Sequence, residues 1–192
     1  MPSKSVEVWF ATSNSHKFRE ASEIVKEYGI TLRRLPAKGR ELQSDSVREI
    51  AGSAALETFA SVRKPLIAED TGLFINALNG FPGPYSSYVQ ETVGNAAILH
   101  LLESTEDRGA EFVTAVAYCR EPSKVRVFVG RLKGRISDAV RGANGFGFDP
   151  IFIPAGSART LAEMTTHEKN HTSHRYLALR AFGLWRNRVR AG

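Results

Sequence analysis

Two adjacent acids, Glu69 and Asp70, follow the apolar run Leu66-Ile67-Ala68 and precede the turn signal Thr71-Gly72. The run is too short for a helix and, entered through Pro65, predicts a buried strand. Carboxylates at the end of a buried strand lose hydration unless a cation or a hydrogen-bond donor compensates them. The pattern therefore favours a metal site. The alternative is a strand end with solvated acids.

A turn-rich segment follows the acids, with the sequence NGFPGPYSS over residues 79–87. Glycine has no side chain, so its backbone can lie close to another segment. We therefore expect a second backbone segment to approach the two acids closely.

A second group of residues able to do chemistry lies near the N-terminus. Val6–Phe10 predicts a first strand, Ala11–Ser15 a turn of small residues, and the next residues a helix that ends at Gly29, with an apolar face formed by Phe18, Ala21, Ile24, Val25 and Tyr28. Backbone N–H groups and the positive dipole end at such a helix start bind anions, and Lys17 adds a full charge. The alternative is an ordinary helix cap by Ser13, Asn14 or Ser15.

A glycine-rich loop at residues 142–150 carries Phe146, Phe148 and Asp149. Exposed phenylalanines lower solubility, so these rings either fold into the core or stack on a planar ligand. The two interpretations stay open at this point.

The segment His167-Glu168-Lys169-Asn170-His171 matches H-E-x-x-H, the pattern of a zinc site on a helix. No Asp or Glu follows Glu168, and His174 has an uncharacteristic spacing for a third ligand. We therefore expect the match to be a coincidence, with a zinc hydrolase as a minor alternative.

The remaining elements must position these groups. We expect a second strand at Ile30–Leu35, a polar loop with Glu41, and a helix from a Ser46 cap to about Arg63 with Val47, Ile50, Ala54 and Phe59 on its apolar face. A helix at 93–103, antiparallel strands at 111–120 and 124–132, and a last helix from Thr165-Thr166, broken or weakened at Gly183, complete the expected order. This order predicts an α/β domain with a mixed sheet.

Length and composition bound the class of protein. A chain of 192 residues with 42% apolar residues can bury one core, so we expect a single domain over residues 1–192. Cys119 cannot form an internal disulfide, and no signal peptide or long apolar run occurs, which favours a cytoplasmic protein.

Much of the net charge of +6 lies in residues 159–192, which contain seven Lys or Arg against Glu163 and Glu168. Such a segment favours a polyanion: nucleic acid, a membrane surface or a nucleotide phosphate chain. A solvated helix face explains its last turns equally well. The main alternative function is a nucleic-acid-binding module that uses this segment and the loop phenylalanines.

Five separated motifs, taken together, resemble those of the inosine triphosphate pyrophosphatase family, which hydrolyses non-standard purine nucleoside triphosphates. The resemblance covers about Val6 to Phe182, and the motifs are Thr12-Ser13-Asn14-Ser15-His16-Lys17, Glu69-Asp70-Thr71-Gly72-Leu73, Phe81-Pro82-Gly83-Pro84-Tyr85-Ser86, Gly145-Phe146-Gly147-Phe148-Asp149-Pro150-Ile151-Phe152, and Glu168-Lys169-Asn170 with Ser173-His174-Arg175.

The resemblance implies an elongated mixed sheet with flanking helices and two lobes around a central nucleotide cleft. It further implies a magnesium cofactor, a homodimer, and neither a membrane nor a stable nucleic-acid partner. ITP, dITP and XTP would be cleaved to the monophosphate and pyrophosphate by water attack at the α-phosphorus.

The resemblance also implies a role for each motif residue. Glu41 and Asp70 would ligate the metal, and Asp70 would be the catalytic acid-base group. The substrate-binding residues would be Thr12, Ser13, Asn14, Ser15, His16 and Lys17 with Thr71 for the phosphates, and Phe146, Gly147, Phe148, Asp149, Lys169, His174 and Arg175 for the base and sugar. We expect Arg175 to donate to the six-keto oxygen of the base, which adenine lacks.

This chain departs from the family pattern at several positions. Ser13 replaces a glycine of many members, and Glu69 replaces an aspartate, so the role of Glu69 beside Asp70 is open. Gly52 and Ser87 stand where some members carry a basic phosphate contact. Other residues must then balance the phosphate charge.

Overall fold

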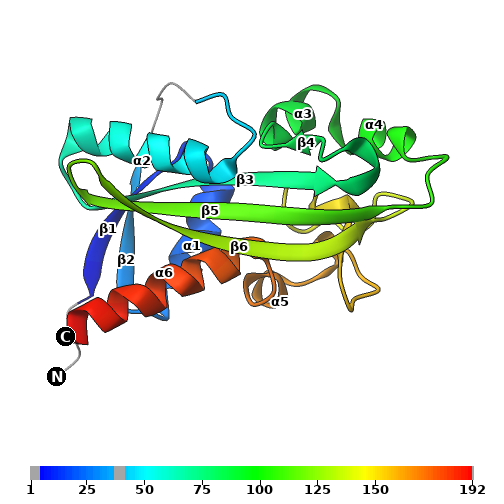
Figure 1. Cartoon of the computed structure of the whole chain (residues 1–192). Coiled ribbons are helices and arrows are strands. Elements are labelled where there is room, and N and C mark those ends of the chain that lie inside the picture. Colours follow the sequence, from blue (N-terminus) through cyan, green and yellow to red (C-terminus); the bar gives the residue numbers. More distant parts are fainter. Residues whose placement is uncertain (1–4, 37–41, 192) are drawn as a thin grey trace. The chain divides into compact units, whose positions relative to one another are not determined.

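The structure, a computed structural model, describes residues 5–36 and 42–191 of the chain. These residues form a mixed α/β fold with a seven-stranded sheet in the order β2-β1-β3-β5-β6-β7, and β4 pairs with β3 (Figure 1). The predicted α/β class with a mixed sheet is confirmed.

The strands are β1 Val6–Ala11, β2 Ile30–Leu35, β3 Leu66–Ile75, β4 Pro82–Gly83, β5 Gly109–Glu121, β6 Lys124–Ile136 and β7 Phe152–Pro154. The α-helices are α1 Ser15–Lys26, α2 Val47–Val62, α3 Ser86–Thr92, α4 Gly94–Leu101, α5 Thr166–Asn170 and α6 His174–Ala191. Three short 3-10 helices are η1 Asn76–Leu78, η2 Asp149–Ile151 and η3 Leu161–Glu163. Within the described ranges, no helix combines the length and apolar character needed to cross a membrane.

The chain divides into two compact units. The first contains residues 1–70, 114–130 and 175–192, and the second contains residues 71–113 and 131–174. The expectation of a single domain over residues 1–192 stays a prediction.

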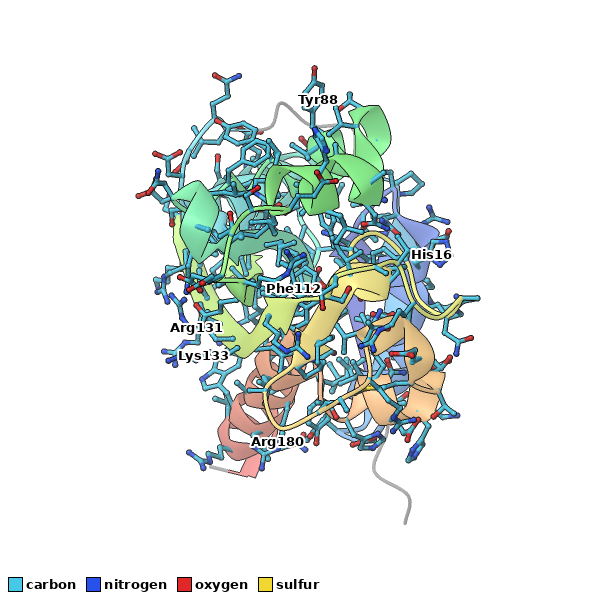
Figure 2. The ribbon with its side chains drawn as sticks, turned by 90° about the vertical axis from the view of Figure 1, so that its right-hand side faces the viewer. His16, Tyr88, Phe112, Arg131, Lys133 and Arg180 are labelled. Carbon is cyan, nitrogen blue, oxygen red and sulfur yellow. The ribbon has the colours of Figure 1, made fainter. Side chains whose placement is uncertain are left out.

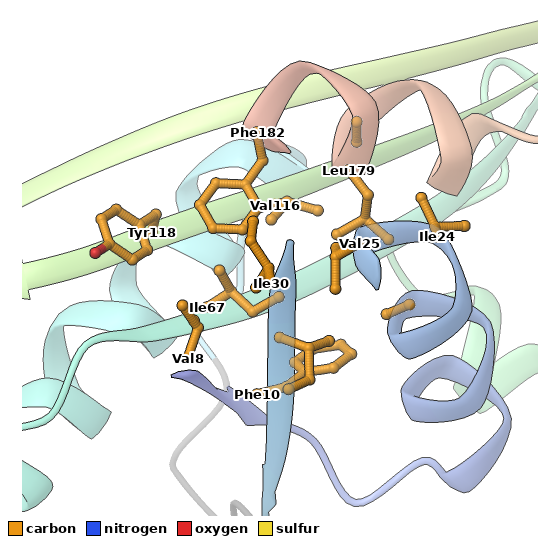
Figure 3. Packing of buried hydrophobic residues seen from close by; sticks show 13 residues of the cluster. Val8, Phe10, Ile24, Val25, Ile30, Ile67, Val116, Tyr118, Leu179 and Phe182 are labelled. Carbon is orange, nitrogen blue, oxygen red and sulfur yellow. The ribbon is translucent and has the colours of Figure 1, made fainter. Parts of the chain in front are cut away.

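In the first unit, β1 pairs in parallel with both β2 and β3. Helices α1 and α6 lie on one face of these strands and α2 lies on the other (Figure 1). Ile24 and Val25 of α1 pack with Leu179 and Phe182 of α6 over Ile67 of β3 (Figure 3). The predicted apolar face of α1 is therefore confirmed at its centre.

Helix α2 begins after its predicted cap, since the Ser46 side chain accepts from the Glu49 N–H at 3.4 Å, and it ends before Arg63, which has φ 52°. Its fully buried stripe runs at every fourth residue through Val47, Ala51, Ala55 and Phe59. Ile50 and Ala54, expected on this face, are half-buried.

In the second unit, the end of β3 pairs with β4 and the end of β6 pairs with β7, both antiparallel. Phe148 packs with Phe112 and Phe152 in the core of this unit. Along β6, Arg131 and Lys133 project to solvent (Figure 2), and Leu132 between them packs against the core. This alternation is the two-residue period of a strand with one buried face.

The strand that carries the acids is longer than predicted. β3 continues to Ile75, so the expected turn at Thr71-Gly72 is wrong. A close backbone approach occurs two residues beyond the acids, because a Cβ on Gly72 would lie 2.7 Å from the Gly83 oxygen. Ser86 fixes this approach: its hydroxyl accepts from the Leu73 N–H at 2.8 Å and donates to the Gly83 oxygen at 2.7 Å.

Two other differences concern helices. Residues 86–92 form α3 where only turns were expected, and the expected last helix is two helices, α5 and α6. Helix α6 continues through Gly183, so the helix is not broken there, which was one of the two expectations. Gly183 makes room for a neighbour, because a Cβ on it would lie 2.3 Å from Cγ of Tyr28.

Candidate active site

A buried network of charges in the first unit surrounds Glu69. Arg175, at the start of α6, donates from Nε to both Glu69 oxygens at 3.2 and 3.0 Å and from Nη2 to Glu69 Oε1 at 2.9 Å. Its Nη1 donates to Glu20 of α1 at 2.7 Å. Arg175 is 1% exposed and the Glu69 side chain is fully buried. One edge of the guanidinium, formed by Nε and Nη2, therefore holds the Glu69 carboxylate, and Nη1 holds Glu20.

Lys17 joins the same carboxylate, with its Nζ 3.4 Å from Glu69 Oε1. Burial alone lowers the pKa of Arg175, but the charges of Glu69 and Glu20 and their hydrogen bonds outweigh burial and raise that pKa above its ordinary value. The guanidinium is therefore permanently charged. Glu69 acts as the counterion of Arg175 and Lys17.

Asp70 follows Glu69 within β3 and is half-buried. Because successive side chains of a strand point to opposite faces, Asp70 points away from the face on which Arg175 and Lys17 meet Glu69. The second predicted ligand, Glu41, lies outside the described residues. Asp70 alone thus retains the candidate metal role among the residues described.

The chemistry of this donor set fits a hard divalent cation. Such a cation takes oxygen ligands and needs only one or two protein carboxylates. In the described ranges, no group of three or more His, Cys, Asp or Glu side chains is placed to hold a metal ion. The chemistry of a carboxylate such as Asp70 therefore fits a divalent cation that takes its remaining ligands from water and phosphate oxygens.

The predicted phosphate turn follows β1 in the first unit. Asn14 caps α1, because its Oδ1 accepts from the N–H groups of His16 at 2.9 Å and Lys17 at 3.1 Å. The Asn14 N–H in turn donates to Thr12 Oγ1 at 3.1 Å. The capping interpretation is therefore confirmed. It leaves the amides of Ser13 and Ser15 without an acceptor in the described part of the chain.

His16 lies at the surface, at the edge of the side-chain view in Figure 2. Arg19 Nη2 is 3.3 Å from its Nδ1. The exposed guanidinium of Arg19 and the N-terminal end of the α1 dipole make this end of the helix electropositive.

A separate polar cluster in the second unit joins the glycine-rich loop to α5. Asp149 Oδ2 accepts from the Phe146 N–H at 2.7 Å and from Lys169 Nζ at 2.6 Å. The Lys169 ammonium also lies 4.7 Å from the centre of the Phe146 ring. The side chains of Asp149 and Lys169 are each 4% exposed, so this ion pair is buried.

Other predicted base-binding residues of the second unit have mixed surroundings. Phe148 is 3% exposed and belongs to the core. Of the two interpretations of the loop phenylalanines, folding into the core therefore applies to Phe148. Gly147 has φ 64° and its carbonyl accepts from Asn95 Nδ2 at 3.2 Å. The His174 ring is buried and stacks on Phe112, with ring centres 4.5 Å apart. Thr71, which was expected near the phosphates, is half-buried.

The structure therefore brings together Lys17, Glu69 and Arg175 in one unit and Phe146, Asp149 and Lys169 in the other. The contacts of Arg175 favour a role in holding carboxylates, in place of the expected contact with the base. Glu20 was missed by the sequence analysis. An acid four residues before Ile24, on the apolar face of α1, was the signal that could have found it.

The H-E-x-x-H match lies on the short helix α5 and the residue after it. Glu168 accepts from the Thr165 N–H at 2.7 Å and pairs with Arg159 at 2.7 Å. The bonds from Arg159 and then Thr165 lower the pKa of Glu168 to about 2. Because a general base needs a pKa near the operating pH, Glu168 is a helix cap and a poor base.

Comparison with known proteins agrees with these features. The model of the Ham1 family matches residues 8–185. A dITP/XTP pyrophosphatase of Methanopyrus kandleri is 49% identical over 94% of this chain and 96% of its own. One of Saccharolobus solfataricus is 45% identical over 93% of each chain.

Solved structures show the same fold. A HAM1 protein from Coxiella burnetii has a TM-score of 0.82 at 30% identity and covers 95% of this chain and 99% of its own. A nucleoside-triphosphatase, dITP/XTP pyrophosphatase from Mycobacterium abscessus has a TM-score of 0.72 at 34% identity, over 92% of this chain and 97% of its own. The chain therefore belongs to the Ham1 family, and the family recognised from its five motifs is confirmed.

Proposed function

We propose that this protein hydrolyses ITP, dITP and XTP to the corresponding monophosphate and pyrophosphate. Relatives that match nearly its whole length at 43–49% identity carry the name dITP/XTP pyrophosphatase. The observation that carries the chemistry is the position of Asp70 in β3, directly after a Glu69 whose charge is already neutralised by Arg175 and Lys17. We therefore assign the catalytic role to Asp70, which lies on the opposite face of β3 from this ion pair.

In this proposal the first unit handles the phosphates. The turn at Thr12–Ser15 offers backbone amides, His16 borders it, and Lys17 supplies a positive charge held in place by Glu69. An Asp70 carboxylate oxygen accepts the proton of the water that attacks the α-phosphorus. Magnesium, held by Asp70 and Glu41, would neutralise phosphate charge and acidify a bound water.

The second unit handles the base and sugar. Phe146 offers a ring for stacking, Lys169 is a donor suited to a six-keto oxygen, and Asp149 holds both through its Oδ2. Gly147, Phe148 and His174 support this set by shaping the loop and its surroundings, and Thr71 is assigned to the phosphates. Discrimination against ATP follows from the donor, because the amino group of adenine cannot accept its hydrogen bond.

The test is hydrolysis in water labelled with oxygen-18. The purified protein is incubated with magnesium and ITP, XTP, dITP, ATP or GTP, and the products are identified by mass spectrometry. We expect IMP that contains the label, unlabelled pyrophosphate, and little turnover of ATP. Release of IDP and phosphate, or label in pyrophosphate, would contradict attack at the α-phosphorus.

Assembly and location complete the proposal. We expect a cytoplasmic homodimer that makes no stable complex with nucleic acid. Light scattering coupled to size-exclusion chromatography measures the mass. A gel shift with duplex DNA and RNA at physiological salt tests the alternative nucleic-acid function of the basic segment at 159–192. At this salt concentration, binding driven by phosphate contacts persists only when many such contacts form.

A further inference from the structure

Arg34, near the end of β2, holds the phosphate turn. Its Nε donates to the Thr12 oxygen at 3.4 Å, and its Nη2 donates to the Ser13 oxygen. The register explains this reach: β2 runs parallel to β1, Arg34 lies opposite Phe10, and the turn begins two residues after Phe10. One guanidinium therefore fixes two consecutive carbonyl groups.

These two bonds set the direction of a backbone donor. In a trans peptide the C=O and the following N–H point in opposite directions. The Thr12 carbonyl points to Arg34, so the Ser13 N–H points away from it. The amides of Thr12, Asn14, His16 and Lys17 donate to protein oxygens. The Ser13 amide has no such acceptor in the part of the chain that the structure describes.

Arg34 also places a positive charge at this turn. Its side chain is exposed and, within residues 5–36 and 42–191, has no carboxylate partner. The neighbouring Arg33 differs, because its Nε lies 2.8 Å from Glu7 Oε2. Two adjacent arginines of one strand thus have different surroundings, and only Arg34 contacts the turn.

We propose that Arg34 is a positioning residue for phosphate binding: it orients the peptide between Thr12 and Ser13 so that the Ser13 amide donates to the substrate's phosphate chain. The inference rests on the proposed function, because that function supplies the phosphate ligand. A guanidinium is needed for this role. A lysine ammonium at the same place is a single point of charge and cannot hold two carbonyls in a fixed fork.

The experiment compares Arg34→Ala and Arg34→Lys with the matched control Arg33→Ala. For each we measure kcat and KM for ITP with magnesium, inhibition by inorganic pyrophosphate, and the thermal midpoint. We expect Arg34→Ala to raise both KM and the pyrophosphate inhibition constant by at least about tenfold, the loss expected for a charge-assisted contact. Arg33→Ala should change each by less than about twofold, since its exposed ion pair contributes little.

Arg34→Lys separates orientation from charge. We expect it to retain the fold and still show most of the loss in pyrophosphate binding. If it behaves like wild type while Arg34→Ala is impaired, charge alone is sufficient and the positioning role is wrong. Should Arg34→Ala fail to fold, the comparison of Arg34→Lys with Arg33→Ala decides the question.

The two proposals can fail separately. If wild type cleaves ITP and Arg34→Ala matches Arg33→Ala in KM and in pyrophosphate inhibition, this inference is overturned and the proposed function stands. If wild type does not cleave ITP but binds pyrophosphate in calorimetry, and Arg34→Ala loses that binding, the positioning of a phosphate site by Arg34 stands without the proposed substrate.

Discussion

The guanidinium of Arg175 lies on the carboxylate of Glu69, although the two residues are 106 positions apart in the chain. Three hydrogen bonds of 2.9–3.2 Å join them, and both side chains are buried. A buried charge without its partner costs several kcal/mol, so each residue depends on the other to remain inside the first unit. Because neighbouring side chains of a strand point to opposite faces, the next residue, Asp70, points away from this pair.

The first prediction concerns the loss of Arg175, the partner of Glu69. In Arg175→Ala, Glu69 and Glu20 become a buried pair of like charges, and we expect the free energy of unfolding to fall by about 3–5 kcal/mol. Arg180→Ala is the matched control on the same helix, since Arg180 is exposed (Figure 2), and it should change stability by less than about 0.5 kcal/mol. Urea unfolding of both variants measures the difference. Equal stabilities would show that the network does not hold the unit together.

The second prediction concerns the carboxylates. We expect Asp70→Asn to lower kcat by at least about a hundredfold, because an amide cannot accept the proton of the attacking water. Glu41→Gln should lower the affinity for magnesium, so that half-maximal rate requires a higher magnesium concentration. Circular dichroism and the thermal midpoint provide the control for folding. Near-normal turnover of Asp70→Asn at saturating magnesium would remove Asp70 from the catalytic role.

The sequence predicted the elements whose signals lie within a short stretch of chain, and it did not predict features that depend on contacts between distant residues. β1, β2, α2 and the β5–β6 hairpin, joined by Pro122-Ser123, were predictable because their signals are local. The continuation of β3 past Glu69 and Asp70 was not. Two acids followed by Thr-Gly read locally as a strand end, whereas Arg175 and Lys17 compensate Glu69 from distant positions.

The candidate site shows the same limit. The family motifs named Lys17, Asp149 and Lys169, and the structure places all three in ion pairs. Their roles toward the substrate, and that of Asp70, stay predictions. The motifs did not reveal that Arg175 faces Glu20 and Glu69, nor that Arg34 reaches the turn after β1. Such contacts depend on strand register and helix placement, which a motif does not contain.

The third prediction uses Gly183. Alanine is the better helix former, but its Cβ at this position would lie 2.3 Å from Tyr28 Cγ. We expect Gly183→Ala to destabilise the first unit by about 1–3 kcal/mol through overpacking. Gly52→Ala in α2 is the control, because its Cβ meets no atom within 4 Å, and a stability gain of up to about 1 kcal/mol is expected there. Thermal midpoints that rise in both variants would contradict the packing argument.

The fourth prediction concerns acid. The pKa of Glu168 is lowered from 4.5 to about 2 by Arg159 and Thr165, so the folded state prefers its ionised form. The resulting stabilisation is fully present above about pH 4.5 and is lost as the pH falls toward 2. We therefore expect Glu168→Gln to lower the thermal midpoint more at pH 7 than at pH 3. A difference that is independent of pH would show that the carboxylate's charge contributes nothing.

The last prediction separates stacking from hydrogen bonding in the second unit. Phe146 can stack on any purine. Lys169, which Asp149 holds at 2.6 Å, is a donor, and at position six of the base only a keto oxygen, not the amino group of adenine, can accept its hydrogen bond. We expect Phe146→Leu to lower kcat/KM for ITP and ATP by similar factors and to leave their ratio within about threefold of wild type. Lys169→Met should narrow the ratio by about tenfold or more, the effect of one lost discriminating hydrogen bond.

Lys169→Met leaves Asp149 as a buried charge, so the variant can lose its fold for that reason alone. The double variant Asp149→Asn/Lys169→Met removes both charges and keeps an acceptor for the Phe146 N–H, which Asp149 now receives at 2.7 Å. Pyrophosphate release from ITP and ATP measures the ratio in each variant. If the ratio stays at the wild-type value in every folded Lys169 variant while Phe146→Leu narrows it, the ring itself selects the base and the polar cluster serves only to hold the loop.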